Sequence, residues 1–123
     1  MKVAIEDVTG VLVLRASGNM RIWGHEEEQE RMLNLLRAQE PPPKRVVLSL
    51  SKVHHMDTSG VGALARVLIE SGKSEIELKV VLPGGFPGEM LRRIHIFDAW
   101  SQFPDEAAAI QAFLSADVAD ERR

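Results

Sequence analysis

The side chains best suited to regulated chemistry in this chain of 123 residues lie together in the segment Asp57-Thr58-Ser59-Gly60. An apolar run at residues 46–48, typical of a buried strand, precedes the segment, and apolar residues at helical spacing follow it from residue 61. We therefore expect a strand, a polar loop and a helix, with two hydroxyls and one carboxylate at the start of the helix.

These residue types admit two interpretations. Asp, Thr and Ser are preferred helix caps, so capping explains part of the composition. A hydroxyl at the start of a helix is also a suitable phosphoacceptor, because unpaired N–H groups and the positive end of the helix dipole stabilise a phosphate there. A phosphate adds a charge of about -1.5 to -2, which changes how the surface docks a partner. Spacing alone leaves both interpretations open.

Other candidate sites are weaker. The four histidines are His25, His54, His55 and His95. His54 and His55 are adjacent, so on an extended segment their side chains point in opposite directions. The sequence has no HExxH spacing and no cysteine, so we predict no metal site and no cofactor. The segment 84–88 is glycine-rich but lacks the Lys-Ser/Thr of a nucleotide-binding loop, which favours a turn. Ser59 lacks the GxSxG pattern, so a small hydrolase stays a remote alternative and we expect no enzyme.

Composition limits the class of protein further. Apolar residues make up 45% and charged residues 27%, with a net charge of -3 and no basic stripe, which argues against nucleic-acid binding. The N-terminus becomes charged too early for a signal peptide, and no apolar run approaches the roughly 20 residues of a membrane span. We expect a cytoplasmic protein without direct membrane insertion.

Alternating patterns predict the elements that position the central segment. Strands at residues 3–8 and 11–17 form a hairpin, and further strands are expected at 76–82 and 96–100. The predicted helices begin near residues 26, 61, 87 and 104, and their stripes of apolar residues face inward. This order predicts an α/β fold, a mixed four- to five-stranded sheet packed with about four helices. The domain is expected to span residues 1–116, followed by a charged tail at 117–123.

The helix after Gly60 has two predicted faces. The face expected to be buried comprises Val61, Leu64, Ala65 and Leu68. The other face comprises Gly62, Arg66, Ile69 and Lys73, and Gly72 is the expected stop.

The central segment resembles the core of the STAS family, which includes the bacterial anti-sigma factor antagonists. The similarity is carried by residues 46–53 and by Met56-Asp57-Thr58-Ser59-Gly60-Val61-Gly62-Ala63-Leu64. More loosely it extends over most of the chain, through the opening hairpin, the helix before Pro41 and the region of residues 94–97. The resemblance implies a single STAS-like domain with no intrinsic catalysis.

The resemblance also implies roles for individual residues. Such antagonists bind an anti-sigma factor of the serine-kinase type, which phosphorylates the hydroxyl directly after the aspartate, and a phosphatase reverses the reaction. In this chain the implied acceptor is Thr58, with Ser59 as second choice. Asp57 would shape the loop and Gly60 would permit close backbone approach. The docking surface would include Ser59 itself and the helix face of Gly62, Arg66 and Ile69.

Three positions differ from the pattern of the sigma-pathway members. Thr58 stands where serine is usual, and Ser49 stands where the central strand often carries Asp or Asn. After the second strand the family often has an acidic residue, whereas this chain has Gly18-Asn19-Met20-Arg21. Arg21 is a candidate partner for a phosphate. Threonine at the acceptor position also resembles the stressosome scaffold and the STAS subunit of bacterial phospholipid ABC transporters. The alternative function is therefore regulation of a transporter ATPase without a phosphate cycle.

Overall fold

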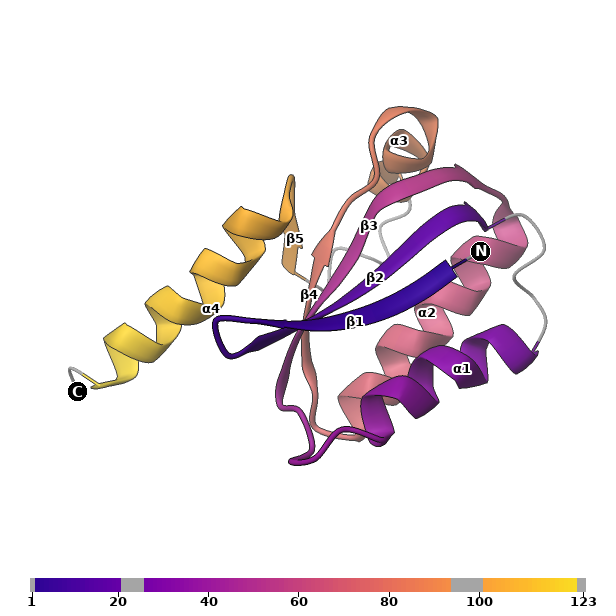
Figure 1. The fold of residues 1–123 in the computed structure, drawn as a ribbon. Coiled ribbons are helices and arrows are strands. Elements are labelled where there is room, and N and C mark those ends of the chain that lie inside the picture. The colour runs from indigo at the N-terminus through magenta and orange to yellow at the C-terminus, as the bar shows by residue number, and fades with distance from the viewer. Residues whose placement is uncertain (1, 21–25, 94–100, 122–123) are drawn as a thin grey trace.

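The fold is a mixed sheet with helices on both faces (Figure 1). The computed structural model of the chain describes residues 2–20, 26–93 and 101–121. In these ranges the strands are β1 (Lys2–Val8), β2 (Val11–Met20), β3 (Arg45–Met56), β4 (Glu77–Val81) and β5 (Ser101–Phe103). The helices in the same ranges are α1 (Glu26–Arg37), α2 (Thr58–Lys73), α3 (Gly85–Arg93) and α4 (Glu106–Glu121). This architecture confirms the predicted α/β fold.

The sheet has the order β1-β2-β3-β4-β5. β1 and β2 form the predicted antiparallel hairpin, whereas β3, β4 and β5 add in parallel. A positive φ of 87° at Gly10 closes the hairpin turn, a conformation that glycine adopts without a steric penalty. Because β2, β3 and β4 are parallel, their carboxyl ends lie at the same end of the sheet, and the segments that follow these strands begin there.

Two apolar cores of unequal size lie on the two faces of the sheet. The larger core packs α1 and α2 against one face, with residues such as Met32, Leu36, Leu64 and Leu68 fully buried. The smaller core packs α4 against the opposite face through Phe113, together with Ala109 and valines of the sheet. In Figure 1, α4 begins beside β5 and runs away from the sheet, so its first turns supply the contacts.

β3 is longer than predicted. The sequence indicated a polar loop after the apolar run, but β3 continues to Met56 and stays paired with β2 to its end. Ser51, Lys52, His54 and His55 are exposed in this half of the strand, so its composition resembles that of a loop. Two register shifts between β2 and β3 also disturb the period-two pattern on which a prediction of a strand relies.

Two further boundaries differ from the expectation. α3 begins at Gly85, inside the segment predicted as a turn, and its buried residues are Pro87, Gly88 and Leu91. α2 ends at Lys73, just past the predicted stop. Its buried residues include Ala63 and Val67, which were not in the predicted stripe, whereas Val61 and Ala65 of that stripe are only partly buried.

Two expectations concern the later part of the chain. The strand predicted at residues 96–100 lies outside the described residues. The short strand β5 begins directly after this range and pairs with β4 at the edge of the sheet. α4 continues to Glu121, through most of the segment expected as a charged tail, and the domain boundary at residue 116 stays a prediction.

Candidate functional site

The backbone turns from strand to helix at Asp57, which caps α2. Asp57 has extended dihedral angles, φ -117° and ψ -175°, and its Oδ1 accepts a hydrogen bond of 3.0 Å from the N–H of Gly60. Its carbonyl oxygen accepts a second bond of 3.1 Å from the N–H of Val61. The side-chain bond satisfies one of the N–H donors that every helix start leaves without an intrahelical partner, and the bond to the carbonyl oxygen is the first intrahelical bond of α2. The predicted helix start and its cap are therefore observed.

Thr58 and Ser59 form the beginning of α2, directly after the cap. Gly60 is buried, so the first turn of the helix lies against the fold at this point. The position of Thr58 matches the position predicted from the sequence, and its role as acceptor, like that of Ser59, stays a prediction.

The predicted docking face of α2 is open to solvent. Gly62 is exposed, and a Cβ built on it would meet no atom within 4 Å. Ile69 is 47% exposed, although it is a large apolar residue. Arg66 donates a hydrogen bond of 2.6 Å from a guanidinium nitrogen to Oε1 of Glu30 on α1. The face of Gly62, Arg66 and Ile69 is thus one continuous surface that α1 borders.

Glu30 is a contact that sequence reasoning missed. It belongs to an acidic run that the sequence presents only as a solvated first turn. Glu30 also lies 3.9 Å from a guanidinium nitrogen of Arg37. Because Glu30 and Arg66 are 36 positions apart, no local spacing reveals their contact.

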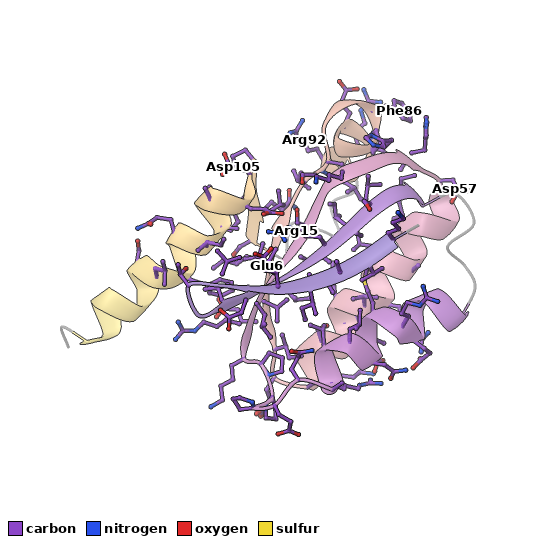
Figure 2. The ribbon with its side chains drawn as sticks, in the orientation of Figure 1. Glu6, Arg15, Asp57, Phe86, Arg92 and Asp105 are labelled. Atoms are coloured by element: carbon purple, nitrogen blue, oxygen red, sulfur yellow. The ribbon has the colours of Figure 1, made fainter. Side chains whose placement is uncertain are left out.

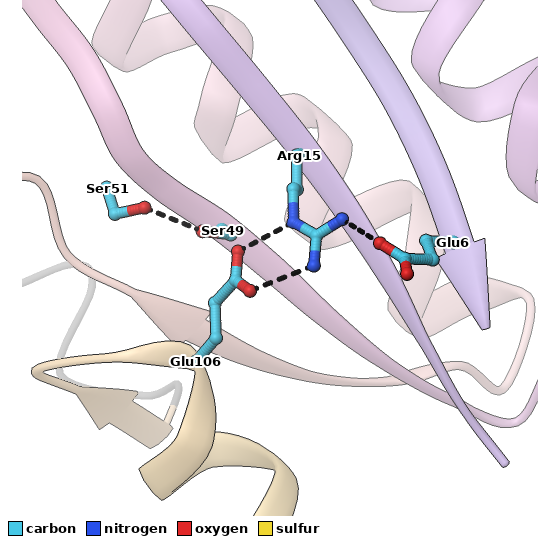
Figure 3. A network of polar contacts seen from close by, with 5 residues as sticks. All are labelled: Glu6, Arg15, Ser49, Ser51 and Glu106. Atoms are coloured by element: carbon cyan, nitrogen blue, oxygen red, sulfur yellow. Dashed lines mark hydrogen bonds and ion pairs between the residues drawn. The ribbon is translucent and has the colours of Figure 1, made fainter. Parts of the chain in front are cut away.

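A polar network on the opposite face of the sheet ties α4 to three strands (Figure 3). Arg15 on β2 donates two hydrogen bonds to the carboxylate of Glu106 on α4, from Nε at 2.9 Å and from a terminal nitrogen at 3.0 Å. Arg15 also pairs with Glu6 on β1. Ser49, which is 1% exposed, lies 3.1 Å from the hydroxyl of Ser51, oxygen to oxygen. Ser49 therefore belongs to the middle of β3 and to this network.

The network shifts the ionisation of its members. Hydrogen bonds from Arg15 lower the pKa of Glu106, and a hydrogen bond with Ser49 lowers it further, against the opposing effect of burial. Glu106 in turn raises the pKa of Arg15, and Glu6 adds to the effect. Both groups stay charged at neutral pH, so the network acts as a structural clamp on α4.

The remaining candidates from the sequence take no part in a metal centre within the described ranges. His54 and His55 are exposed on β3, and no group of three His, Asp or Glu side chains that could hold a metal ion occurs among the described residues. His25, His95 and Arg21 lie outside the described residues. No helix in the described part of the chain is both long and apolar enough to cross a membrane.

Solved structures with the same fold identify the architecture. An anti-sigma factor antagonist from Mycobacterium paratuberculosis superimposes with a TM-score of 0.72 at 21% identity, over 90% of this chain and 92% of that chain. The anti-sigma factor antagonist SpoIIAA in its unphosphorylated form gives a TM-score of 0.63 at 18% identity, over 91% and 97%. A sulfate transporter family protein from Wolinella succinogenes gives 0.69 at 20% identity, over 88% of both chains.

Because each identity is below 25%, these likenesses establish the fold alone. A comparison with curated proteins found no match. The family model of the STAS domain matches residues 2–109, which is most of the chain. The chain therefore belongs to the STAS domain family.

Proposed function

We propose that this STAS domain is a non-catalytic signalling protein of the cytoplasm, an anti-sigma factor antagonist that binds an anti-sigma factor of the serine-kinase type. Phosphorylation of Thr58 by that kinase releases the partner, and a phosphatase restores binding. The observation that carries the proposal is the capped start of α2, which sets Thr58 directly after Asp57 and beside an exposed helix face.

The physical basis is the charge that a phosphate would add at a docking surface. The first turn of a helix tolerates a phosphate because its N–H groups and dipole stabilise negative charge. The same charge of about -1.5 to -2 repels a partner that binds the neutral surface and leaves the fold in place. The likeness to two anti-sigma factor antagonists supports this choice of partner.

The test is phosphoryl transfer followed by intact-mass measurement. The purified chain is incubated with the serine-kinase anti-sigma factor of the same cell and with ATP, alongside the variants Thr58→Ala and Ser59→Ala. We expect the mass of one phosphoryl group on the wild type and on Ser59→Ala, and none on Thr58→Ala. Wild-type protein that stays unmodified by an active kinase, or a phosphoryl group that persists on Thr58→Ala, would contradict the proposal.

A second candidate function rests on the likeness to the sulfate transporter family protein. In this alternative the domain is the STAS subunit that regulates the ATPase of a bacterial phospholipid ABC transporter, through the same face of α2. It predicts that an ATPase subunit co-purifies with the wild type and with Thr58→Ala equally. Recovery of a kinase without any ATPase would dismiss this alternative.

A further inference from the structure

Phe86 is an exposed aromatic side chain that the fold does not use. It is 70% exposed in the first turn of α3, whereas its helix neighbours Pro87, Gly88 and Leu91 are buried. Figure 2 shows Phe86 at the same end of the molecule as Asp57. Large aromatic side chains at the surface are typical of binding sites, where they bury much apolar area on contact with a partner.

A hollow of about 510 Å³ lies beside Phe86, between α3 and the carboxyl half of β3. Its apolar lining includes Val53, Met56 and Pro87, which are all buried. Its polar lining includes residues His54 and His55, which are both exposed. This chemistry suits an apolar side chain whose neighbours carry hydrogen-bond acceptors.

Charge selects the kind of segment that fits. The chain as a whole has a net charge of -3, yet none of the described residues that line the hollow is a carboxylate. The imidazole N–H of histidine donates hydrogen bonds to carboxylates. An acidic segment therefore meets no like charge among the described residues that line this hollow.

The hollow lies next to the start of α2. Met56 lines the hollow as the last residue of β3, and Asp57 follows it as the cap of α2. A partner that covers the start of α2 is therefore in reach of Phe86.

We propose that the hollow receives an apolar side chain from an acidic segment of the same partner protein that binds α2, with Phe86 as the aromatic anchor. The identity of that partner rests on the function proposed above. The hollow adds a contact that does not depend on Thr58, so it contributes affinity in both phosphorylation states.

The first experiment measures the Kd of the serine-kinase anti-sigma factor for the wild type and for two α3 variants. Phe86→Ala removes the anchor, and Glu89→Ala is the matched control because Glu89 is exposed on the same helix outside the lining of the hollow. We expect Phe86→Ala to weaken binding roughly 30-fold, the loss typical of an aromatic hot spot. Glu89→Ala should not weaken binding, because it removes no contact with the occupant of the hollow and only takes away a negative charge. Equal thermal midpoints of all three proteins would confirm that the fold is intact.

The second experiment uses a defined probe and does not need the kinase. Amide chemical shifts are recorded during titration with an acetylated Glu-Asp-Leu-Glu-Asp peptide, and with a Lys-Arg-Leu-Arg-Lys peptide as control. We expect the acidic peptide alone to shift amides of residues 53–56 and 84–88, and Phe86→Ala to abolish these shifts.

The outcomes separate the two proposals. Equal kinase affinity for the wild type and Phe86→Ala would overturn the inference and leave the proposed function standing. A kinase that does not bind the wild type would overturn the proposed function, and the peptide titration then decides whether the hollow takes acidic segments. Equal shifts with both peptides, no shifts, or a Phe86-dependent dimer in sedimentation would overturn the inference.

Discussion

The ion pair between Arg15 and Glu106 offers the sharpest test of how α4 is held on the sheet. Its two hydrogen bonds measure 2.9 and 3.0 Å, and the two side chains are 31% and 27% exposed. Fully exposed ion pairs contribute about 0.2–1 kcal/mol, whereas hydrogen bonds to charged groups reach about 1.5–3 kcal/mol. The half-buried bidentate geometry places the expected coupling free energy at about 1–2 kcal/mol.

A double-mutant cycle isolates this coupling. The free energy of unfolding in urea is measured for the wild type, Arg15→Met, Glu106→Ala and the double variant. The cycle is needed because Arg15 also pairs with Glu6 and because Glu106 lies in the first turn of α4, where a negative charge favours the helix dipole. Both effects cancel if they are independent of the pair.

A second cycle provides the matched control. The pair between Arg66 and Glu30 is shorter, at 2.6 Å, but its side chains are 41% and 42% exposed, so we expect a coupling free energy below about 1 kcal/mol. A coupling for Arg15 and Glu106 that is no larger than the control value would refute the role assigned to the polar network.

Three further predictions follow from the same geometry. Because the pKa of Glu106 is lowered in the folded state, its contribution to stability is complete above the ordinary glutamate pKa of about 4.3 and is lost as pH falls through the lower folded value. The free energy of unfolding, measured in urea at descending pH, should therefore fall more steeply for the wild type than for Glu106→Gln. Gly62→Ala and Gly72→Ala both meet open space in α2, so each should raise the unfolding free energy by up to about 1 kcal/mol, while only the Gly62 variant should weaken the binding of the kinase. Gly88→Ala would place its Cβ 2.1 Å from the carbonyl oxygen of Pro83, so it should destabilise the fold by roughly 1–3 kcal/mol in urea unfolding, and the absence of any loss would contradict the close packing.

Local patterns were enough to predict the centre of the fold. The hairpin, the cap at Asp57 and the burial of Leu64 and Leu68 on α2 each depend on residues close in sequence, whose period and type determine the local structure. The exposed face of α2 followed from the same helical spacing, and Gly62 and Ile69 lie on it as expected.

Patterns of residues close in sequence could not predict contacts between residues that are far apart in the chain. Arg15 and Glu106 are 91 positions apart, and nothing near either residue marks it as a partner of the other. The glycines and prolines around Phe86 indicate a turn, yet α3 begins at Gly85 with a φ of 61°, a conformation that favours glycine. Pro87 then falls within the first turn, where its missing N–H leaves no helical bond unmade.

The two halves of β3 differ in their surroundings, and this difference affects the thermodynamics of association. From Val46 to Leu50 the strand is buried on both faces, between α1 and α2 on one side and α4 on the other. The half that leads to Asp57 is exposed at most positions but continues the same strand. A binding surface carried by a strand so firmly held loses little conformational entropy when a partner docks. Most of the interaction energy at this end of the sheet is then available as affinity, and the free and bound backbones should be nearly the same.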